Sequence, residues 1–457
     1  MSASAIRPTR FALWAVSLAL FCVQLDLFTL NLAVPSMAAD LHVAPAAMQW
    51  AVSGYLLAAG ALMIAFGRLG DLLGHRRVLL IGVTVFGAAS LACALVSSAG
   101  VLVALRVVQG AGAAMIMPVG LALLTDVFPA AQRGRAMGFA FAVAGVGTAA
   151  GPFVGGALTE WAGWRWIFLI NVPFAMVAAL LIRKIPTSDR GRKQTVVDWP
   201  GVALVTVAVA ALIGGVDRSH AWGWVSARTL GLFAVGALAL VAFVVVESRV
   251  RHPLINLSLF RDRKYVMITS TGTVANAAIA VCLAVAALYL QQVRHLSPVG
   301  AGVAYLLPAI AIALMGPVAG RLSRRRSPLR VLAAATAIGG AALLAVASAH
   351  GLPFYIVAVG VCCAALQLGY CLTTIATQSV VRRERAGEAS GVTLTAMVTG
   401  AGVGTALTDS SLAGKAVLTS GVLSGPLLVA AVACLGTAGV LAFVRSGRAK
   451  GAVAGTP

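Results

Sequence analysis

The chain has 457 residues, of which 60% are hydrophobic and 10% are charged, and its mean hydropathy is +0.97. Its net charge of +21 comes from 34 basic and 13 acidic residues. Fourteen apolar stretches leave no connection long enough for a folded soluble domain, and each approaches the ~20 residues that an α-helix needs to cross a bilayer. These features exclude a soluble globular protein.

The apolar stretches predict transmembrane helices. In lipid, only helices and closed barrels satisfy every backbone polar group, and barrel strands alternate apolar with polar residues. The stretches 199–216 and 329–347 are apolar without alternation. We therefore expect an all-α polytopic membrane protein with helices over 12–34, 48–66, 78–97, 100–124, 136–158, 166–183, 200–216, 228–247, 266–290, 300–319, 329–349, 353–377, 389–411 and 423–444.

The basic residues predict the orientation of these helices. If the helices alternate in direction from the first, 28 Lys and Arg residues fall on the side of the N-terminus, 5 fall on the opposite side, and Arg106 lies within a helix. Basic residues concentrate in cytoplasmic loops. We therefore expect both termini in the cytoplasm. Because Arg outnumbers Lys 29 to 5 and Ala, Gly and Val dominate, the sequence is typical of a GC-rich bacterial genome, and we expect a multi-pass protein of the bacterial plasma membrane. The placement of the basic residues also argues against a nucleic-acid partner.

The sequence lacks the residue patterns that are typical of metal sites and of nucleotide-binding loops. The seven cysteines all fall within predicted spans, and metal-ligand spacing is absent. The six histidines lie in loops or at span ends, and the chain has no phosphate-binding loop of the Gly-x-x-x-x-Gly-Lys-Ser/Thr type. We expect no metal site, no cofactor and no enzymatic activity.

The connections between helices divide the chain. Two longer basic segments, 184–199 and 248–265, bracket the seventh and eighth spans. The expected organisation is a six-helix bundle over 1–185, two linker helices with flanking loops over 186–262, and a second six-helix bundle over 263–457. The hexapeptide at 144–149 recurs letter for letter at 401–406, each time in the fifth helix of its bundle. This predicts parallel repeats with a substrate site between them near the membrane midplane.

Two charges lie at membrane depth in the first bundle. Asp26 is the only acidic residue well inside it, and Arg106 lies in the fourth helix, three residues before Gln109. A charge at the bilayer centre costs roughly 2.5–3.5 kcal/mol on insertion scales and usually faces a cavity or a partner. We expect Asp26 and Arg106 to meet in the outer half of the bundle. The alternative is a static ion pair that only fixes packing.

A second pattern connects the second and third helices. It places a carboxylate among glycines and arginines, at Gly67, Asp71, Gly74, Arg76 and Arg77. Charge pairs that form in one conformation and separate in another bias the equilibrium between the two. A gating loop is one interpretation, and an ordinary basic loop at the end of a span is the other.

A third pattern lies in the fifth helix. Glycines recur at Gly147, Gly151 and Gly155, and Pro152 and Gly156 accompany them. Glycines four residues apart line one helix face and admit a second backbone, while proline kinks a helix. The alternative is a stripe that serves packing alone.

Together with the stretches 25–35, 49–55 and 164–173, these patterns resemble the 14-helix drug:proton antiporter family of the major facilitator superfamily. The gating loop departs from the family pattern at Leu72 and His75, where basic residues are usual. The resemblance implies export of amphipathic drugs or antibiotics in exchange for protons, with the proton gradient as energy source. It also implies that Asp26 is the proton-linked carboxylate and that the fifth-helix pattern belongs to antiporters rather than importers.

The expected partners are a small amphipathic substrate, protons and the lipid bilayer, with the monomer as the functional unit. Uptake of a sugar, peptide or organic anion is the alternative, and the scarcity of membrane carboxylates weighs against it. If Asp26 does not couple protons, Asp409 is the next candidate. Six polar or aromatic residues are candidates for the substrate cavity, although each also suits helix packing: Asn31, Tyr55, Gln109, Tyr305, Gln367 and Tyr370.

Overall fold

The computed structural model describes residues 3–30, 33–48, 50–186, 198–250, 253–255, 257–296, 298–349, 351–382, 385–412 and 419–453. Within these ranges every regular element is a helix. Side chains of a few residues at helix ends and at Pro152 lie outside the description. The all-α fold expected from the sequence is confirmed.

The helices fall into two groups with a pair between them. The first helix group comprises α1 (Ala3–Leu30), α2 (Val34–Asp40), α3 (Pro45–Met48), α4 (Trp50–Leu73), α5 (His75–Leu95), α6 (Ala99–Val127), α7 (Ala130–Trp161), α8 (Arg165–Leu169) and α9 (Asn171–Arg183). The pair is α10 (Trp199–Trp222) and α11 (Ala227–Arg249), followed by the 3₁₀ segment η1 (Leu257–Arg261). The second helix group comprises α12 (Arg263–Leu288), the π-helical turn η2 (Tyr289–Val293), α13 (Pro298–Arg325), α14 (Pro328–Ala347), α15 (Leu352–Val380), α16 (Ala386–Leu412) and α17 (Ser420–Val453).

The described residues hold 13 helices long and apolar enough to cross a membrane, or 14 when the two parts of α7 count as one span. The parts of α7 meet at an angle of 46° between Gly151 and Phe153. Pro152 lies at this bend, where its missing N–H interrupts the helical hydrogen bonds. The fourteen predicted spans agree with this count.

Two predicted spans differ in detail from the described helices. The first was expected to run to residue 34, whereas the described part of α1 ends at Leu30 and α2 begins at Val34, with Pro35 in its first turn, where proline is favourable. The sixth runs from Arg165 to Arg183 as one span, as expected, although Ile170 separates α8 from α9 within it. Pro173 lacks the N–H that would continue the helix across this point.

The segment expected to be a loop at 67–77 is almost entirely helical. Helix α4 continues to Leu73 and α5 begins at His75. Only Gly74 lies between them, with φ of +96°. Glycine tolerates this backbone conformation because it has no Cβ. The prediction of a loop was wrong because a single glycine is enough for the turn.

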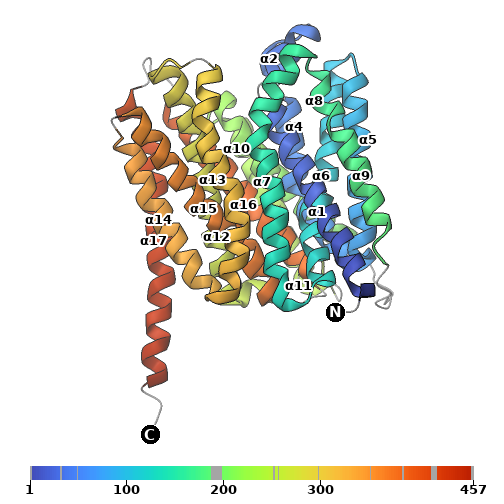
Figure 1. The fold of residues 1–457 in the computed structure, drawn as a ribbon, viewed down its shortest axis with the longest axis vertical. Coiled ribbons are helices and arrows are strands. Elements are labelled where there is room, and N and C mark those ends of the chain that lie inside the picture. Colours follow the sequence, from blue (N-terminus) through green and yellow to red (C-terminus); the bar gives the residue numbers. More distant parts are fainter. Residues whose placement is uncertain are drawn as a thin grey trace.

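Equivalent helices pack in the same way in both groups. Helix α1 packs on α7 as α12 packs on α16, and α6 packs on α4 and α5 as α15 packs on α13 and α14. The groups meet where α4 contacts α16 and where α7 contacts α13. Helices α7 and α13 lie side by side in Figure 1. Helices α10 and α11 pack together, and α10 contacts both α4 and α16. Because equivalent helices make equivalent contacts in the two groups, the groups have the arrangement expected of two structural repeats.

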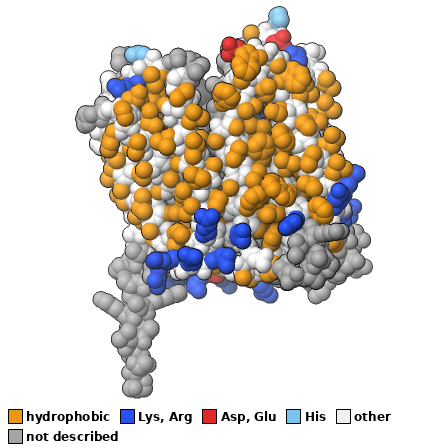
Figure 2. Space-filling model, in the orientation of Figure 1, with side chains coloured by type: hydrophobic (Ala, Val, Ile, Leu, Met, Phe, Trp, Pro, Cys, Tyr) orange, Lys and Arg blue, Asp and Glu red, His pale blue; other side chains and the backbone are white. Residues whose placement is uncertain are grey.

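The two ends of the molecule differ in charge. Figure 2 shows hydrophobic side chains over the flank of both groups and Lys and Arg side chains gathered at the lower end. Helix α1 begins and α17 ends at this same end (Figure 1). We call it the basic end. The apolar flank is suited to lipid.

Candidate functional site

The structure brings Asp26 of α1 and Arg106 of α6 together. Arg106 Nη1 donates to Asp26 Oδ2 at 2.6 Å, and both side chains have 0% exposure. Arg106 Nε also donates to the carbonyl of Ala51, in the first turn of α4, at 2.9 Å. One guanidinium therefore connects three helices at a point closed to solvent.

Two amide side chains complete the surroundings of the carboxylate. Gln109 Nε2 and Asn171 Nδ2 donate to Asp26 Oδ1 at 2.9 and 3.0 Å. Gln109 also accepts from Arg106 Nη1 at 2.7 Å and donates to Ser90 Oγ at 2.7 Å. Asp26 thus accepts three hydrogen bonds, and the one from the guanidinium is charge-assisted. We call Asp26, Ser90, Arg106, Gln109 and Asn171 the Asp26 cluster.

Aromatic rings cover the guanidinium. The Tyr55 and Phe168 ring centroids lie 4.2 and 5.7 Å from Arg106 Cζ, and neither residue is more than 1% exposed. Cationic guanidinium groups are attracted to ring faces, more strongly when desolvated. Every member of the Asp26 cluster belongs to the first helix group, so the cluster lies inside that group rather than between the two groups.

Sequence reasoning found part of this cluster. It paired Asp26 with Arg106, but it placed Gln109 and Tyr55 among residues lining a substrate cavity, whereas both contact the ion pair. It assigned no role to Asn171 or Ser90. Asn171 lies in the stretch 164–173 that carried part of the family resemblance, and this was the available signal. Ser90 is one of two hydroxyl residues in α5, the other being Thr84, and no pattern distinguishes it.

A second polar arrangement joins the two groups at the basic end. Asp71, at the end of α4, accepts hydrogen bonds from the backbone N–H groups of Gly387 and Glu388, each at 2.8 Å. These N–H groups belong to the first turn of α16, where a carboxylate is favourable. Arg68 Nη1 also lies 3.7 Å from the Glu388 carboxylate. The interaction clamps α4 against α16.

His75 holds this carboxylate from the other side. Its Nε2 lies 2.8 Å from Asp71 Oδ1 and its Nδ1 lies 2.6 Å from Asp126 Oδ2. The sequence suggested arginine partners for Asp71, but Arg76 donates instead to the carbonyls of Ile182 and Arg183. His75, one of the two departures from the family pattern, bridges two carboxylates.

Glycines bring the two groups into backbone contact near the basic end. A Cβ on Gly67 would lie 2.3 Å from the carbonyl oxygen of Gly387. A Cβ on Gly138 would lie 2.5 Å from that of Gly316, and one on Gly320 would lie 2.4 Å from that of Gly134. Any larger residue would separate α4 from α16 or α7 from α13. The structure is therefore closed at the basic end.

The glycine stripe of the fifth predicted helix faces α1. Added Cβ atoms would lie 2.8 Å from Phe21 O at Gly147, 2.5 Å from Phe28 Cβ at Gly151, and 2.4 Å from Thr29 O at Gly155. Gly156 is half-buried beside them. The stripe thus lets α7 approach the helix that carries Asp26.

The remaining cavity candidates are dispersed. Tyr370 of α15 meets Phe141 of α7 edge-to-face, with centroids 5.9 Å apart, across the two groups. Gln367 Nε2 lies 3.7 Å from Cys371 Sγ, one turn away on the same helix. Asn31 lies outside the described residues, as does the side chain of Asp409.

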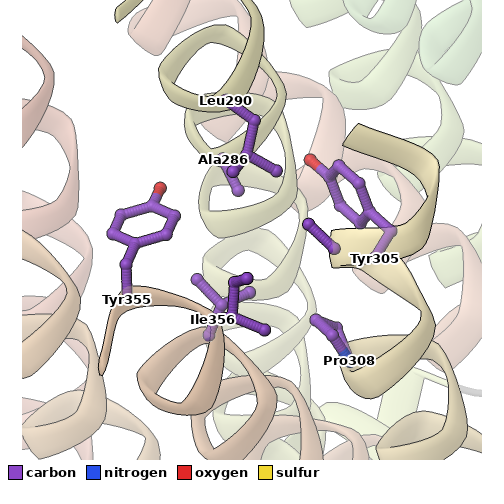
Figure 3. A pocket seen from close by; sticks show the side chains of 8 residues that line it. Ala286, Leu290, Tyr305, Pro308, Tyr355 and Ile356 are labelled. Carbon is purple, nitrogen blue, oxygen red and sulfur yellow. The ribbon is translucent and has the colours of Figure 1, made fainter. Parts of the chain in front are cut away.

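Tyr305 lines a small cavity inside the second group, between α12, α13 and α15 (Figure 3). The other lining residues are Ala286, Leu290, Ala304, Pro308, Tyr355, Ile356 and Val359, and the cavity volume is about 10 Å³. The Tyr305 hydroxyl donates to the Leu283 carbonyl at 2.6 Å. Ligand pockets usually measure about 300–1,000 Å³, so this cavity is too small for a drug-sized molecule.

Comparison with known proteins places this geometry in a family. The family model described as Major Facilitator Superfamily matches residues 16–405. The chain is 36% identical over 417 residues to the tetracenomycin C resistance and export protein of Streptomyces glaucescens, covering 88% of this chain and 76% of the relative. It is 34% identical over 413 residues to the multidrug resistance protein Stp of Mycobacterium tuberculosis, covering 89% and 76%.

Solved structures agree at the level of the fold. The structure of the human organic anion transporter MFSD10 superimposes with a TM-score of 0.68 over 96% of this chain and 100% of that one, at 14% identity. The family match, the export proteins of similar sequence and the paired helix groups lead to one assignment. The chain belongs to the major facilitator superfamily of membrane transporters.

Proposed function

We propose that this chain is a proton-coupled antiporter that exports amphipathic drugs or antibiotics across the bacterial plasma membrane. The observation that carries the proposal is the sealed carboxylate of Asp26, held by three donors in a chain that resembles named export proteins. Intramembrane ionisable residues are costly and usually functional. A carboxylate that alternates between ionised and protonated forms is what proton coupling requires.

The orientation follows from the charge at the two ends. The basic end carries most of the Lys and Arg side chains in Figure 2, which supports placing it in the cytoplasm. Both termini are then cytoplasmic. The contacts between the groups near this end make the described conformation closed to the cytoplasm.

Helix α4 connects the Asp26 cluster to the closed end. Arg106 holds the carbonyl of Ala51 at the start of α4, and Asp71 holds α16 near its end. Twenty residues separate Ala51 from Asp71, about 30 Å along a helix. Protonation of Asp26 weakens its electrostatic attraction to Arg106. It thereby changes the hydrogen bond by which Arg106 of α6 binds the Ala51 carbonyl of α4. A small tilt of α4 then acts on the contacts with α16 at the basic end.

The proposed cycle needs no cofactor, because the proton gradient supplies the energy. Protons and a small amphipathic substrate act from opposite sides while the two groups rock about their contact. Each chain contains both groups, so a monomer within the bilayer is sufficient.

The test is transport by the purified protein in liposomes under an imposed pH gradient. The substrate is an antibiotic identified by susceptibility profiling of a strain that lacks its other pumps. We expect Asp26→Asn to abolish gradient-driven accumulation while the protein remains folded. Accumulation by Asp26→Asn at the wild-type rate would contradict the assignment of Asp26.

Asp40→Asn is the matched control. Asp40 ends α2 on the exposed surface, where Arg165 Nη1 and Trp164 Nε1 donate to it at 2.7 and 3.1 Å. These hydrogen bonds, chiefly that from Arg165, hold the pKa of Asp40 below its ordinary value. Asp40 therefore remains ionised throughout the neutral range, and we expect Asp40→Asn to transport as the wild type does.

A further inference from the structure

The Asp26 cluster is arranged for a carboxylate and not for a carboxylic acid. Every group within hydrogen-bonding distance of its two oxygens is a donor: Arg106 Nη1 on Oδ2, and Gln109 Nε2 and Asn171 Nδ2 on Oδ1. An ionised carboxylate only accepts, whereas a protonated one has an O–H that must donate. A proton added to either oxygen would therefore face another N–H group unless a neighbour rearranges.

Two of the three neighbours have no freedom to rearrange. Arg106 has no acceptor atom in any orientation. Gln109 Oε1 accepts from Arg106, and its Nε2 donates to Ser90 as well as to Asp26. Turning the Gln109 amide would place its oxygen towards Asp26 and its N–H groups towards Arg106, breaking the contact with the guanidinium.

Asn171 is different because half of its amide is uncommitted. Its Oδ1 is buried and has no hydrogen-bond partner among the described residues. Its Nδ2 donates to Asp26 and makes only one further contact, with the Ile167 carbonyl at 3.5 Å. A half-turn about the Cβ–Cγ bond of Asn171 brings Oδ1 to the position beside Asp26 that Nδ2 occupied. Nδ2 then takes the position in which Oδ1 had no partner. The turn therefore gives up little beyond the long contact to Ile167.

We propose that Asn171 is the positioning residue that lets Asp26 change protonation state, by turning its amide from donor to acceptor. This inference rests on the proposed role of Asp26. In the ionised state Asn171 Nδ2 donates to Asp26 Oδ1, as observed. In the protonated state Oδ1 carries a proton taken from water, and its O–H donates to Asn171 Oδ1. The proton comes from hydronium in the aqueous phase: one O–H bond of hydronium breaks, the O–H bond on Asp26 Oδ1 forms, and a neutral water molecule is released.

The other ionisable groups around the cluster do not offer this acceptor. Arg106 of α6 is cationic and has no acceptor. The ring of Tyr55 of α4 lies over its guanidinium. The Tyr55 hydroxyl is also buried without a hydrogen-bond partner among the described residues, so it makes no hydrogen bond to Asp26. Cys22 of α1 and Cys93 of α5 are the remaining titratable neighbours, and both are buried. Helix α7 presents the glycine stripe and no charge to α1. Asn171, at the start of α9, is thus the available partner for the acid.

The test uses proton-induced infrared difference spectra of the full-length protein in liposomes, with the asparagine side-chain carbonyl isotopically labelled. Lowering the pH should produce a carboxylic-acid band of Asp26 together with a shift of an asparagine amide band. Both should be absent in Asp26→Asn. Asn171→Leu, which has similar volume but neither donor nor acceptor, should remove the amide signal and move the carboxylic-acid band to the frequency of a weakly bonded acid.

Asn171→Thr is the rescue variant, because a hydroxyl can rotate to donate or to accept. It should keep the carboxylic-acid band at the wild-type position and retain gradient-driven export within about threefold, whereas Asn171→Leu should lose about tenfold, the effect expected when a hydrogen bond to a charged group is removed. A carboxylic-acid band that is unchanged in Asn171→Leu would overturn the inference. So would an amide signal that persists in this variant.

The two proposals fail in different ways. If the infrared bands behave as expected but a pH gradient drives no export, the antiport proposal is wrong and the role of Asn171 stands. If Asp26→Asn abolishes export but wild type and Asn171→Leu share the same carboxylic-acid band, proton coupling stands and the amide turn is wrong.

Discussion

At the scale of single residues, the ion pair between Asp26 and Arg106 is maintained by its neighbours. Removing both charges from water costs several kcal/mol per ion, and the Coulomb attraction repays this only when the remaining donors and acceptors are satisfied. Gln109 and Asn171 donate to the carboxylate, and Ala51 and Gln109 accept from the guanidinium, whose Nη2 alone is buried without a hydrogen-bond partner among the described residues. Proton exchange with Asp26 requires these helices to part, since the side chain has 0% exposure.

We therefore predict that Arg106→Ala abolishes gradient-driven export and destabilises the protein by about 3–5 kcal/mol, the cost of leaving a buried charge unpaired. Arg106→Lys keeps the charge but loses the planar fork that reaches both Asp26 and Ala51. It should retain a small activity whose pH optimum is displaced upward. Drug-dependent proton release across a pH series and thermal unfolding in detergent measure these effects. Full activity with an unchanged optimum in Arg106→Ala would show that the two charges do not communicate.

At the scale of helices, α7 has two glycine faces with different neighbours. Gly147, Gly151 and Gly155 admit α1, and Gly138 and Gly145 admit α13 of the second group. Helix α7 thus packs closely against both α1, which contains Asp26, and α13 of the second helix group. Close backbone packing between small residues is the usual way in which membrane helices associate.

The repeated hexapeptide supplies a matched pair of substitutions. A Cβ on Gly145 would lie 2.7 Å from Ala313 Cα, whereas a Cβ on the equivalent Gly402 would meet no described atom within 4 Å. We predict that Gly145→Ala costs about 1–3 kcal/mol by overpacking, while Gly402→Ala is neutral or gains up to ~1 kcal/mol of helix propensity. Thermal unfolding of the two variants measures the difference.

Labelling provides the second readout for this pair. Ser323 of α13 lies against Gly134 of α7 in the closed end, and the seven native cysteines are buried. In a Ser323→Cys background, Gly145→Ala should raise the rate of maleimide labelling and Gly402→Ala should not. Equal labelling and equal unfolding temperatures would mean that α7 and α13 do not need this close approach.

At the scale of the whole molecule, two groups related by exchange of equivalent helices meet at the basic end. The clamp of Asp71 on the first turn of α16 and the glycine contacts lie on the same side as the Lys and Arg residues. In Figure 2 a notch divides the outline of the two groups at the opposite end. A conformation closed at one end and parted at the other is one of the states that alternating access requires.

Topology is the corresponding prediction. We expect reporter fusions after Asp40 and after Lys450 to report opposite compartments, with the second in the cytoplasm. The reason is the excess of basic residues at the end where α17 terminates. Fusions that report the same compartment would contradict the arrangement of fourteen spans.

The sequence by itself determined that this is a helical membrane protein with about fourteen spans, because hydrophobic length and backbone hydrogen bonding in lipid leave few alternatives. It also paired Asp26 with Arg106, because a membrane charge needs a partner. It did not determine that Gly74 alone separates α4 from α5, since one glycine is a weak local signal. Only the tertiary structure showed Asn171, Gln109 and Ser90 around the carboxylate and His75 between two carboxylates. These contacts depend on how helices distant in sequence are rotated and packed, and the spacing of residues along one helix does not encode that.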